Sequence, residues 1–138
     1  MDSIDLKILQ QLEQNAKITT KELAQHVHLS APAVAERVKK LEDQHVIKGY
    51  RTEIDLKQLD RNVMAIVLFK SSNCQKLAEF CYNHPDVLAC YRVAGEISYI
   101  VKVAMTSIEK LEEFIDSAMP YGTPSTNIVL SGRENTVF

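Results

Sequence analysis

The chain has 138 residues, of which 46% are hydrophobic and 25% are charged, a composition typical of folded globular proteins. This composition excludes a disordered chain, and the length allows one or two small domains. The formal net charge of −2 is not that of a general polyanion binder. The longest apolar run, residues 63–69, is far shorter than the roughly 18 residues of a membrane span, so no membrane partner is expected.

The compartment is predicted from the N-terminus and the cysteines. Residues 1–5 carry two acidic side chains and do not resemble a signal peptide. Cys74, Cys81 and Cys90 are odd in number and lie within apolar segments. We expect them to be reduced, buried thiols of a cytoplasmic protein rather than disulfide partners.

Three helices are predicted in the N-terminal third of the chain. Residues 3–15 carry apolar side chains at helical spacing, which predicts the first helix. Thr19 and Glu22 have the spacing of a capping box, which predicts a second helix that opens at Thr19. Ser30 has the position of an N-cap for a third helix, with Pro32 tolerated in its first turn.

The third helix has a narrow apolar stripe, and its other residues are small or charged. Such a helix can lie deep in the major groove, as the second helix of a helix-turn-helix does. The apolar-basic turn at residues 46–50 then predicts a small wing. We therefore interpret residues 1–50 as a winged helix-turn-helix domain whose partner is double-stranded DNA.

Five basic side chains fall within residues 37–51, against two acidic ones. Arg37 could reach a base edge, a phosphate or a structural carboxylate. Among the residues that would face the bases, only Glu36 has a directional polar group, which could accept from a cytosine amine. We therefore expect modest sequence specificity, with a contribution from DNA bending or groove shape. The expected phosphate contacts are Lys39, Lys40, Lys48 and Arg51, and the other positions expected at the DNA are Ser30, Ala31, Pro32, Ala33, Glu36 and Arg37.

Residues 51–61 mix apolar and charged side chains and predict a linker with a short strand. Residues 62–138 then predict the element order βαββαβ, with a hairpin at Gly95 and Glu96 and a capping box formed by Thr106 and Glu109. This order is the ferredoxin-like α+β arrangement, a four-stranded antiparallel sheet with both helices on one face. The predicted strands cover residues 63–70, 87–94, 97–104 and 126–130, and the predicted helices cover residues 74–82 and a segment from 106.

Residues 63–69 do not alternate between apolar and polar side chains, so both faces of this strand favour burial. In so small a domain the helices cover one face, and a second copy of the chain most simply covers the other. The sequence therefore predicts a homodimer.

The motifs along the chain resemble the Lrp/AsnC family of feast/famine transcription regulators. Residues 5–12 resemble its D-x-x-I-L-x-x-L opening, residues 34–42 resemble V-x-x-R-V-K-R-L-E, and residues 46–50 match V-I-x-G-Y. The resemblance covers essentially the whole chain. It implies a DNA-binding regulator that dimerises through its C-terminal domains, often assembles into octamers, and binds an amino-acid effector between those domains. No enzymatic activity, metal or cofactor is expected.

Three positions depart from the family pattern. His45 stands where the family usually has Gly before V-I, and we expect it to adopt the left-handed conformation, which His tolerates better than most residues. Asp60 also replaces a common Gly. Ser98 replaces the acid of a G-x-x-D effector loop, and a hydroxyl offers no charge-assisted partner to an ammonium group. An LrpC-like branch of the family also lacks this acid, and residues 90–95 resemble that branch.

The resemblance implies seven effector positions. A plain tight hairpin is an equal alternative for those in residues 95–99, whereas those in residues 128–130 are first of all expected in the core. The seven positions are Gly95, Glu96, Ser98, Tyr99, Ile128, Val129 and Leu130.

Two other functions are considered beside effector-tuned regulation. An architectural protein that wraps DNA without any effector is favoured by the sparse base readout and by Ser98. Sirohaem decarboxylases resemble the same two-domain plan, but the C-terminal half has too few basic side chains to hold an anionic tetrapyrrole. His26 and His28 lie on different faces of one helix, so they are not expected to bind a metal.

Overall fold

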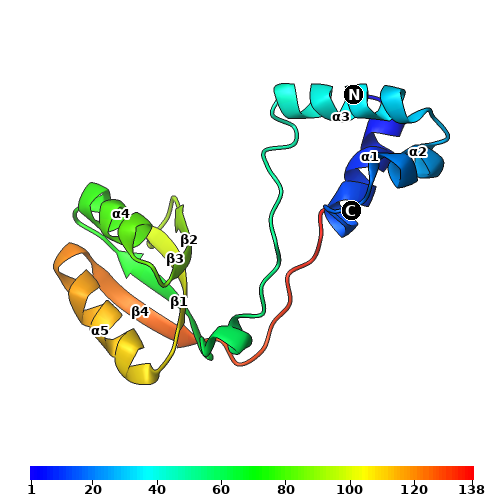
Figure 1. Ribbon diagram of the computed structural model, residues 1–138. Helices are drawn as coiled ribbons and strands as arrows, with labels where there is room; N and C mark the ends of the chain where they lie inside the picture. The colour runs from blue at the N-terminus through cyan, green and yellow to red at the C-terminus, as the bar shows by residue number, and fades with distance from the viewer. The chain divides into compact units, whose positions relative to one another are not determined.

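The computed structural model describes residues 1–138 and divides into two compact units (Figure 1). The first unit comprises Met1–Glu53 together with Arg133–Phe138, and the second comprises Ile54–Gly132. The last six residues, which the sequence assigned to the C-terminal domain, therefore pack with the N-terminal unit instead. No helix in the structure is long and apolar enough to cross a membrane.

The first unit is built from α1 (Ser3–Gln14), α2 (Thr20–Val27) and α3 (Ala31–Asp43). The predicted caps are confirmed: the Thr19 hydroxyl accepts from the amide of Glu22, whose carboxylate accepts from the amide of Thr19, and Ser30 caps α3. The three helices enclose one small core. Its fully buried members are Ile8, Leu23, Ala24, Val27, Val34 and Leu41.

Left-handed residues end two of these helices without glycine. His28 closes α2 at φ 56°, and His45 follows α3 at φ 56°. The conformation predicted for His45 is thereby confirmed. The amide of His45 donates to the Glu42 carbonyl at 2.9 Å, and the amides of Val46 and Ile47 both donate to the Leu41 carbonyl, so all three amides after the helix are bonded to its last turn.

Replacing His45 with Gly should stabilise the fold. Glycine adopts this conformation without the steric cost that a side chain incurs, although it also gains entropy in the unfolded chain. We expect His45→Gly to raise the free energy of unfolding by about 0.5–1 kcal/mol, measured by urea denaturation followed by circular dichroism. His26→Gly is the matched control, because His26 lies within α2 and glycine there should lower stability by about 1 kcal/mol. Equal destabilisation by both variants would contradict the expectation.

The expected short strand in the linker is absent. Residues 44–62 contain no strand, and Leu56–Leu59 form a 3-10 helix that Asp55 caps by accepting from the Lys57 amide at 3.0 Å. A lone strand has no neighbour with which to pair its backbone groups, whereas a capped turn satisfies them locally. Asp60 ends this turn in the left-handed conformation, φ 57°.

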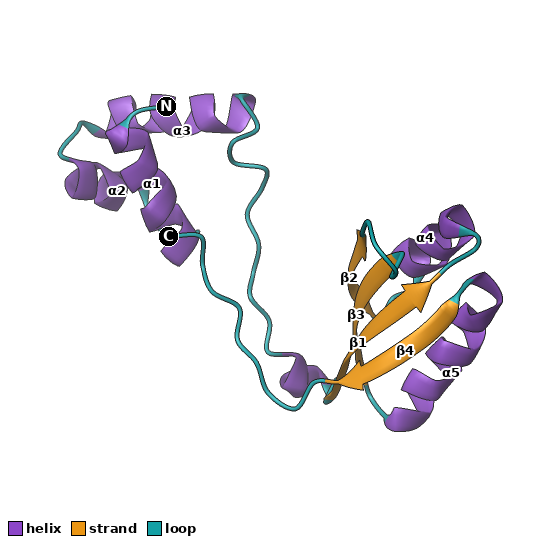
Figure 2. Ribbon diagram, turned by 180° about the vertical axis from the view of Figure 1, so that it is seen from behind, coloured by secondary structure: helices purple, strands orange, loops and turns teal.

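The second unit has the predicted βαββαβ order. Its four strands are antiparallel in the spatial order β2-β3-β1-β4, and both helices lie on one face of the sheet (Figure 2). The elements are β1 (Val63–Lys70), α4 (Cys74–Asn83), β2 (Val87–Arg92), β3 (Tyr99–Met105), α5 (Ile108–Ala118) and β4 (Thr123–Ile128).

Several boundaries in this unit differ from the sequence prediction. β2 ends at Arg92 rather than at residue 94, β3 covers Tyr99–Met105 rather than residues 97–104, and β4 ends at Ile128 rather than at residue 130. Ser107, not Thr106, caps α5 and accepts from the Lys110 amide at 3.1 Å. The last strand begins at Thr123 rather than at residue 126 and includes Pro124. Proline is tolerated there because β4 is an edge strand, where a missing amide can be placed on the unpaired side.

The sheet buries one face under the helices and leaves the other open. Ala65, Val67 and Phe69 of β1 are fully buried on the helix side, with α4 and α5 packed over them. The alternate residues of β1, Met64, Ile66 and Leu68, are only half-buried. Because cross-strand partners share a face, Ile100 beside Leu68 extends this apolar surface onto β3.

The three cysteines form no disulfide. Cys81 is buried in the core on the inner face of α4, whereas Cys74 and Cys90 are half-buried. Burial, with the neighbouring Cys90, raises the pKa of the Cys81 thiol to about 12. This thiol is therefore a weak nucleophile at neutral pH.

Candidate nucleic-acid interface

The α2–turn–α3 arrangement presents the outer face of α3 to solvent. Val34 and Leu41 are buried against the other helices, and the opposite face carries exposed Glu36, Lys39 and Lys40. Pro32 at the start of the helix is exposed, and Ala31 and Ala33 are half-buried, so no bulky side chain stands in front of this face. The Ser30 hydroxyl accepts from the Ala33 amide at 3.4 Å and thus serves as the helix cap.

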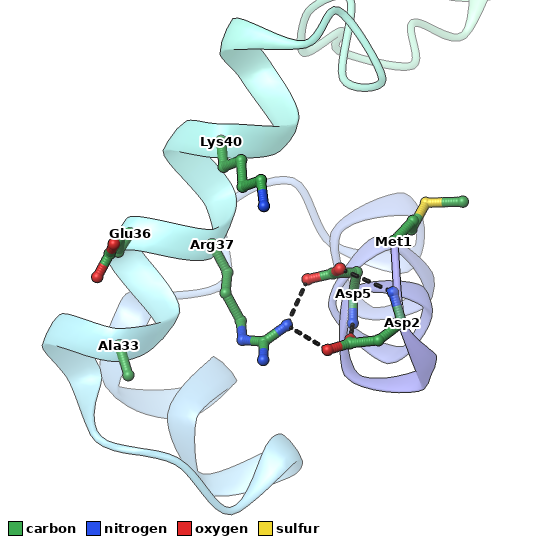
Figure 3. A pocket seen from close by; sticks show the side chains of 7 residues that line it. All are labelled: Met1, Asp2, Asp5, Ala33, Glu36, Arg37 and Lys40. Carbon is green, nitrogen blue, oxygen red and sulfur yellow. Dashed lines mark hydrogen bonds and ion pairs between the residues drawn. The ribbon is translucent and has the colours of Figure 1, made fainter.

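Arg37 is held by two carboxylates of the first helix. Its Nη1 lies 2.8 Å from an oxygen of Asp2 and 2.8 Å from an oxygen of Asp5 (Figure 3). The sequence placed Arg37 among the expected DNA contacts while leaving a structural role open, and the structure corrects this by pairing its guanidinium with two carboxylates of the same unit. The sequence did not indicate which acids would be its partners, because they lie more than thirty positions away.

Asp2 and Asp5 also form the capping box of α1. Asp2 accepts from the amides of Ile4 and Asp5, and Asp5 accepts from the amide of Asp2, each at 2.9 Å. One charge cluster therefore both begins α1 and fixes α3 against it. Figure 3 shows the Arg37 side chain directed toward the two acids, with Glu36 directed away from them.

The pKa of the Asp2 carboxyl is lowered from 3.8 to about 2, chiefly by the hydrogen bond from the Asp5 amide and then by Arg37. Because the pKa of Asp2 in the folded state is below the ordinary value, the ionised carboxylate stabilises the fold. This stabilisation is complete above about pH 4 and is lost as the pH falls toward 2. We therefore expect Arg37→Gln to destabilise the protein at pH 6 and the difference from wild type to shrink between pH 4 and pH 2. Urea midpoints measured across this range test the prediction, and a difference independent of pH would contradict it.

The segment after α3 is tied back to the helix by Tyr50. Its hydroxyl donates to the Glu42 carboxylate at 2.7 Å. Partial burial and this carboxylate raise the pKa of Tyr50 to about 12, so the hydroxyl remains a donor at neutral pH. The bond positions the exposed side chains of Lys48 and Arg51 on the segment that follows the C-terminal end of α3. The sequence motif contained Tyr50 but gave no indication of this role.

The expected effector residues fall into two separate groups. Ser98 lies beside the end of β1, where its amide donates to the Phe69 carbonyl at 2.7 Å and its hydroxyl accepts from the Ser71 amide at 3.0 Å. Ile128 instead pairs with Ala65, four residues earlier on β1 than Phe69. At about 3.3 Å per residue, the two groups lie roughly 13 Å apart along the strand. One chain therefore does not bring them together.

The exposure of these residues corrects two expectations. Tyr99 is only 4% exposed and belongs to the core between sheet and helices, so it does not line a surface site. Ile128 and Leu130, first of all expected in the core, are 46% and 95% exposed. Gly95 and Glu96 are exposed in the β2–β3 loop, and Val129 is half-buried with its amide bonded to the Met64 carbonyl.

No group of three or more His, Cys, Asp or Glu side chains in the structure is placed to hold a metal ion. His26 lies exposed near the end of α2, and His28 is its left-handed cap.

A helix-turn-helix with a small-residue, basic outer helix, followed by a βαββαβ domain, defines a two-domain DNA-binding transcription regulator. Residues 1–48 match the family model of a winged helix-turn-helix DNA-binding domain, and residues 62–136 match that of the Lrp/AsnC ligand binding domain. The chain belongs to the Lrp/AsnC family of transcriptional regulators.

Curated relatives cover nearly the whole chain. An uncharacterized HTH-type transcriptional regulator of Bacillus subtilis, YezC, is 44% identical over 95% of this chain and 94% of its own. The regulator LrpC of the same organism is 34% identical over 95% of this chain and 92% of its own. That the relatives are named as regulators fits a non-enzymatic role.

Solved structures agree with the fold. The structure of LrpC superposes with a TM-score of 0.93 at 33% identity and covers 99% of both chains. A transcriptional regulator from Neisseria meningitidis, solved as a complex with L-methionine, has a TM-score of 0.91 at 25% identity and covers 99% of this chain and 94% of its own.

Proposed function

We propose that the protein docks on duplex DNA through the outer face of α3 and the segment that follows it. The exposed, unobstructed face of α3 is the observation that carries this assignment. Lys39, Lys40, Lys48 and Arg51 are exposed and supply phosphate contacts. Arg37 is excluded from these contacts because Asp2 and Asp5 already neutralise it.

Base recognition falls to the beginning of α3. Ala31, Pro32 and Ala33 offer only small apolar surface, and Glu36 offers one acceptor for a cytosine amine. One copy of the domain therefore discriminates poorly between sequences. Repeated contacts and the deformability of the DNA supply the remaining specificity.

The functional unit in this proposal is a homodimer joined through the open sheet face. Met64, Ile66, Leu68 and Ile100 form an apolar surface that this chain leaves half-buried, and Tyr91, opposite Ile100, is 60% exposed. A second copy of the same face would cover it under twofold symmetry. Further assembly into an octamer, implied by the family resemblance, stays a prediction.

The effector in this proposal is an apolar amino acid held between two C-terminal domains. The separation of Ser98 from Ile128 and Leu130 within one chain supports a site that needs a second copy. The exposed Ile128 and Leu130 suit an apolar side chain, and the Neisseria regulator binds L-methionine.

Ser98 should limit the affinity for such an effector. A carboxylate bonded to an ammonium group is worth about 1.5–3 kcal/mol, or about 10- to 150-fold in affinity. We expect Ser98→Asp to tighten binding of L-methionine or L-leucine at least about tenfold, as measured by calorimetry, because the acid can meet the ammonium group. Ser98→Asn is the matched control, since it matches aspartate in size without the charge.

Two outcomes would contradict this assignment. If Ser98→Asn strengthens binding as much as Ser98→Asp, the ammonium group does not lie at this position. If the folded, DNA-competent protein and both variants show no heat with any of the twenty amino acids, the second function applies, an architectural DNA-wrapping protein without an effector. The bond between Ser98 and the Ser71 amide favours this second function, because it gives Ser98 a purely structural role.

A further inference from the structure

A groove on the first unit runs between one face of α1 and the segment after α3. Its volume is about 880 Å³, and its apolar wall is formed by Leu6, Leu9, Leu12, Val46, Ile47 and Tyr50. Leu6 and Val46 are 40% and 44% exposed, so the helical core does not use this surface fully. The proposed DNA contacts on α3 do not line the groove, whereas Lys48 and Arg51 of the segment after α3 do.

The end of the described chain lies in this groove. The amides of Val137 and Phe138 donate to the two carboxylate oxygens of Glu13, at 2.7 Å and 3.1 Å. Both residues line the groove, and Phe138 is 47% exposed against 85% for Val137. Glu13 thus holds two consecutive backbone amides, and the Phe138 ring is the better covered of the two side chains.

The local sequence suits this docking. Leu6, Leu9 and Glu13 are spaced at i, i+3 and i+7 on α1, which places two apolar side chains and the carboxylate on one helix face. An extended segment is complementary to such a face if it offers an apolar side chain to the two leucines and two backbone N–H groups to the carboxylate. Hydrogen bonds to a charged acceptor are also the stronger kind.

We propose that this groove is the docking site of the chain's own segment Arg133–Phe138, and that the docked segment is a second tether between the two units. The chain passes between the units at Glu53–Ile54 and again at Gly132–Arg133. The second passage restrains the DNA-binding unit only while residues 137 and 138 are docked. It begins three residues after Leu130, and it therefore links the end of β4 mechanically to the DNA-binding unit.

Amide hydrogen exchange in the full chain tests the docking. In the wild type the amides of Val137 and Phe138 should exchange at least about tenfold more slowly than in an unstructured peptide, and Glu13→Ala should remove this protection. Glu112→Ala, which removes an exposed helical carboxylate elsewhere, should leave the protection unchanged. Phe138→Ala keeps Glu13 intact and should also reduce the protection. Unprotected amides in the wild type would overturn the proposal.

A disulfide trap identifies the copy to which the segment belongs. Ala16 also lines the groove, so Ala16→Cys combined with Val137→Cys leaves Glu13 intact. This pair should oxidise to a link within one chain, which peptide mapping distinguishes from any link to Cys74, Cys81 or Cys90. Lys21→Cys with Val137→Cys is the control and should not form the link. A covalent dimer through the engineered pair would show that the segment docks on a second copy and would overturn the intrachain assignment.

The tether should also affect DNA binding, and this consequence rests on the proposed function. On a long duplex that engages two DNA-binding units, Phe138→Ala should lower the affinity by about 3- to 10-fold. Loss of the tether lets each DNA-binding unit sample more positions, so once one unit is bound, the effective concentration of the other at the second site on the duplex is lower. Binding to a duplex of about 12 base pairs should be unchanged. If the protein binds neither duplex, the proposed DNA interface is wrong. The hydrogen-exchange and disulfide experiments then still test whether the C-terminal segment docks in the groove. An equal loss on both duplexes would overturn the tether.

Discussion

The double variant Lys39→Ala, Lys40→Ala should lose roughly 100-fold in affinity for duplex DNA at about 0.1 M salt, for every sequence alike. Each phosphate contact contributes about 0.9 to the slope of log affinity against log salt concentration. At 0.1 M salt this corresponds to roughly tenfold in affinity per contact. The slope should therefore flatten by about 1.8 for each bound protomer. Fluorescence anisotropy with a duplex of about 12 base pairs, measured between 50 and 200 mM salt, gives both quantities.

The matched control removes the same charge from elsewhere. Lys57 and Lys76 are exposed in the second unit, and Lys57→Ala with Lys76→Ala changes the net charge by the same two units. If the control lowers the affinity as much as the double variant does, the effect comes from total charge rather than from contact. An unchanged salt slope in Lys39→Ala, Lys40→Ala would remove both residues from the interface.

Substituting Glu36 distinguishes contacts that read the bases from contacts that only hold the protein on the phosphates. If it accepts from a cytosine amine, Glu36→Ala should relax sequence preference, whereas the two lysine changes should not. All three substituted residues lie on the exposed face of α3, away from the buried Val34 and Leu41. The helix itself should therefore be preserved, and the comparison reports on the interface alone.

The elements of this fold could be predicted where a local pattern determines them. The capping residues Thr19 and Ser30 begin their helices as expected, and β1 occupies the expected residues 63–70. In each case the deciding interactions lie within a few positions along the chain. The same logic fails by one residue at α5, where two adjacent hydroxyls, Thr106 and Ser107, compete and only the geometry of the turn selects Ser107.

The contacts that join distant segments could not be predicted in this way. Arg37 meets Asp2 and Asp5, which are 35 and 32 positions away, and Glu13 binds amides 124 and 125 positions away. No periodicity or spacing indicates which of many acids will be the partner. The candidate site was therefore predicted as a set of exposed basic residues, but the structural role of Arg37 and the tie from Tyr50 to Glu42 required the three-dimensional arrangement.

Leu68→Lys should convert the proposed dimer to monomers. Leu68 lies on the open sheet face between Ile100 and Ser125, its cross-strand neighbours on either side. Completing the burial of the half-buried leucine side chain is worth about 1 kcal/mol. Desolvating the lysine ammonium at the interface costs at least about as much again. Twofold symmetry counts the combined loss of about 2 kcal/mol twice. A loss of about 4 kcal/mol corresponds to roughly a 10³-fold rise in the dimer dissociation constant. Sedimentation velocity over a range of protein concentrations measures this change.

The monomer itself should stay folded, because Leu68 is only half-buried in a single chain and a lysine there can extend its amine to water. Ile108→Lys is the control, since Ile108 is 56% exposed at the start of α5, on the helix side of the sheet. Leu68→Lys should bind a duplex of about 12 base pairs as the wild type does but should lose the tighter binding to a long duplex, because two linked DNA-binding units gain affinity from their effective concentration. Wild-type sedimentation by Leu68→Lys would exclude this face as the interface and would assign the affinity for long DNA to another contact.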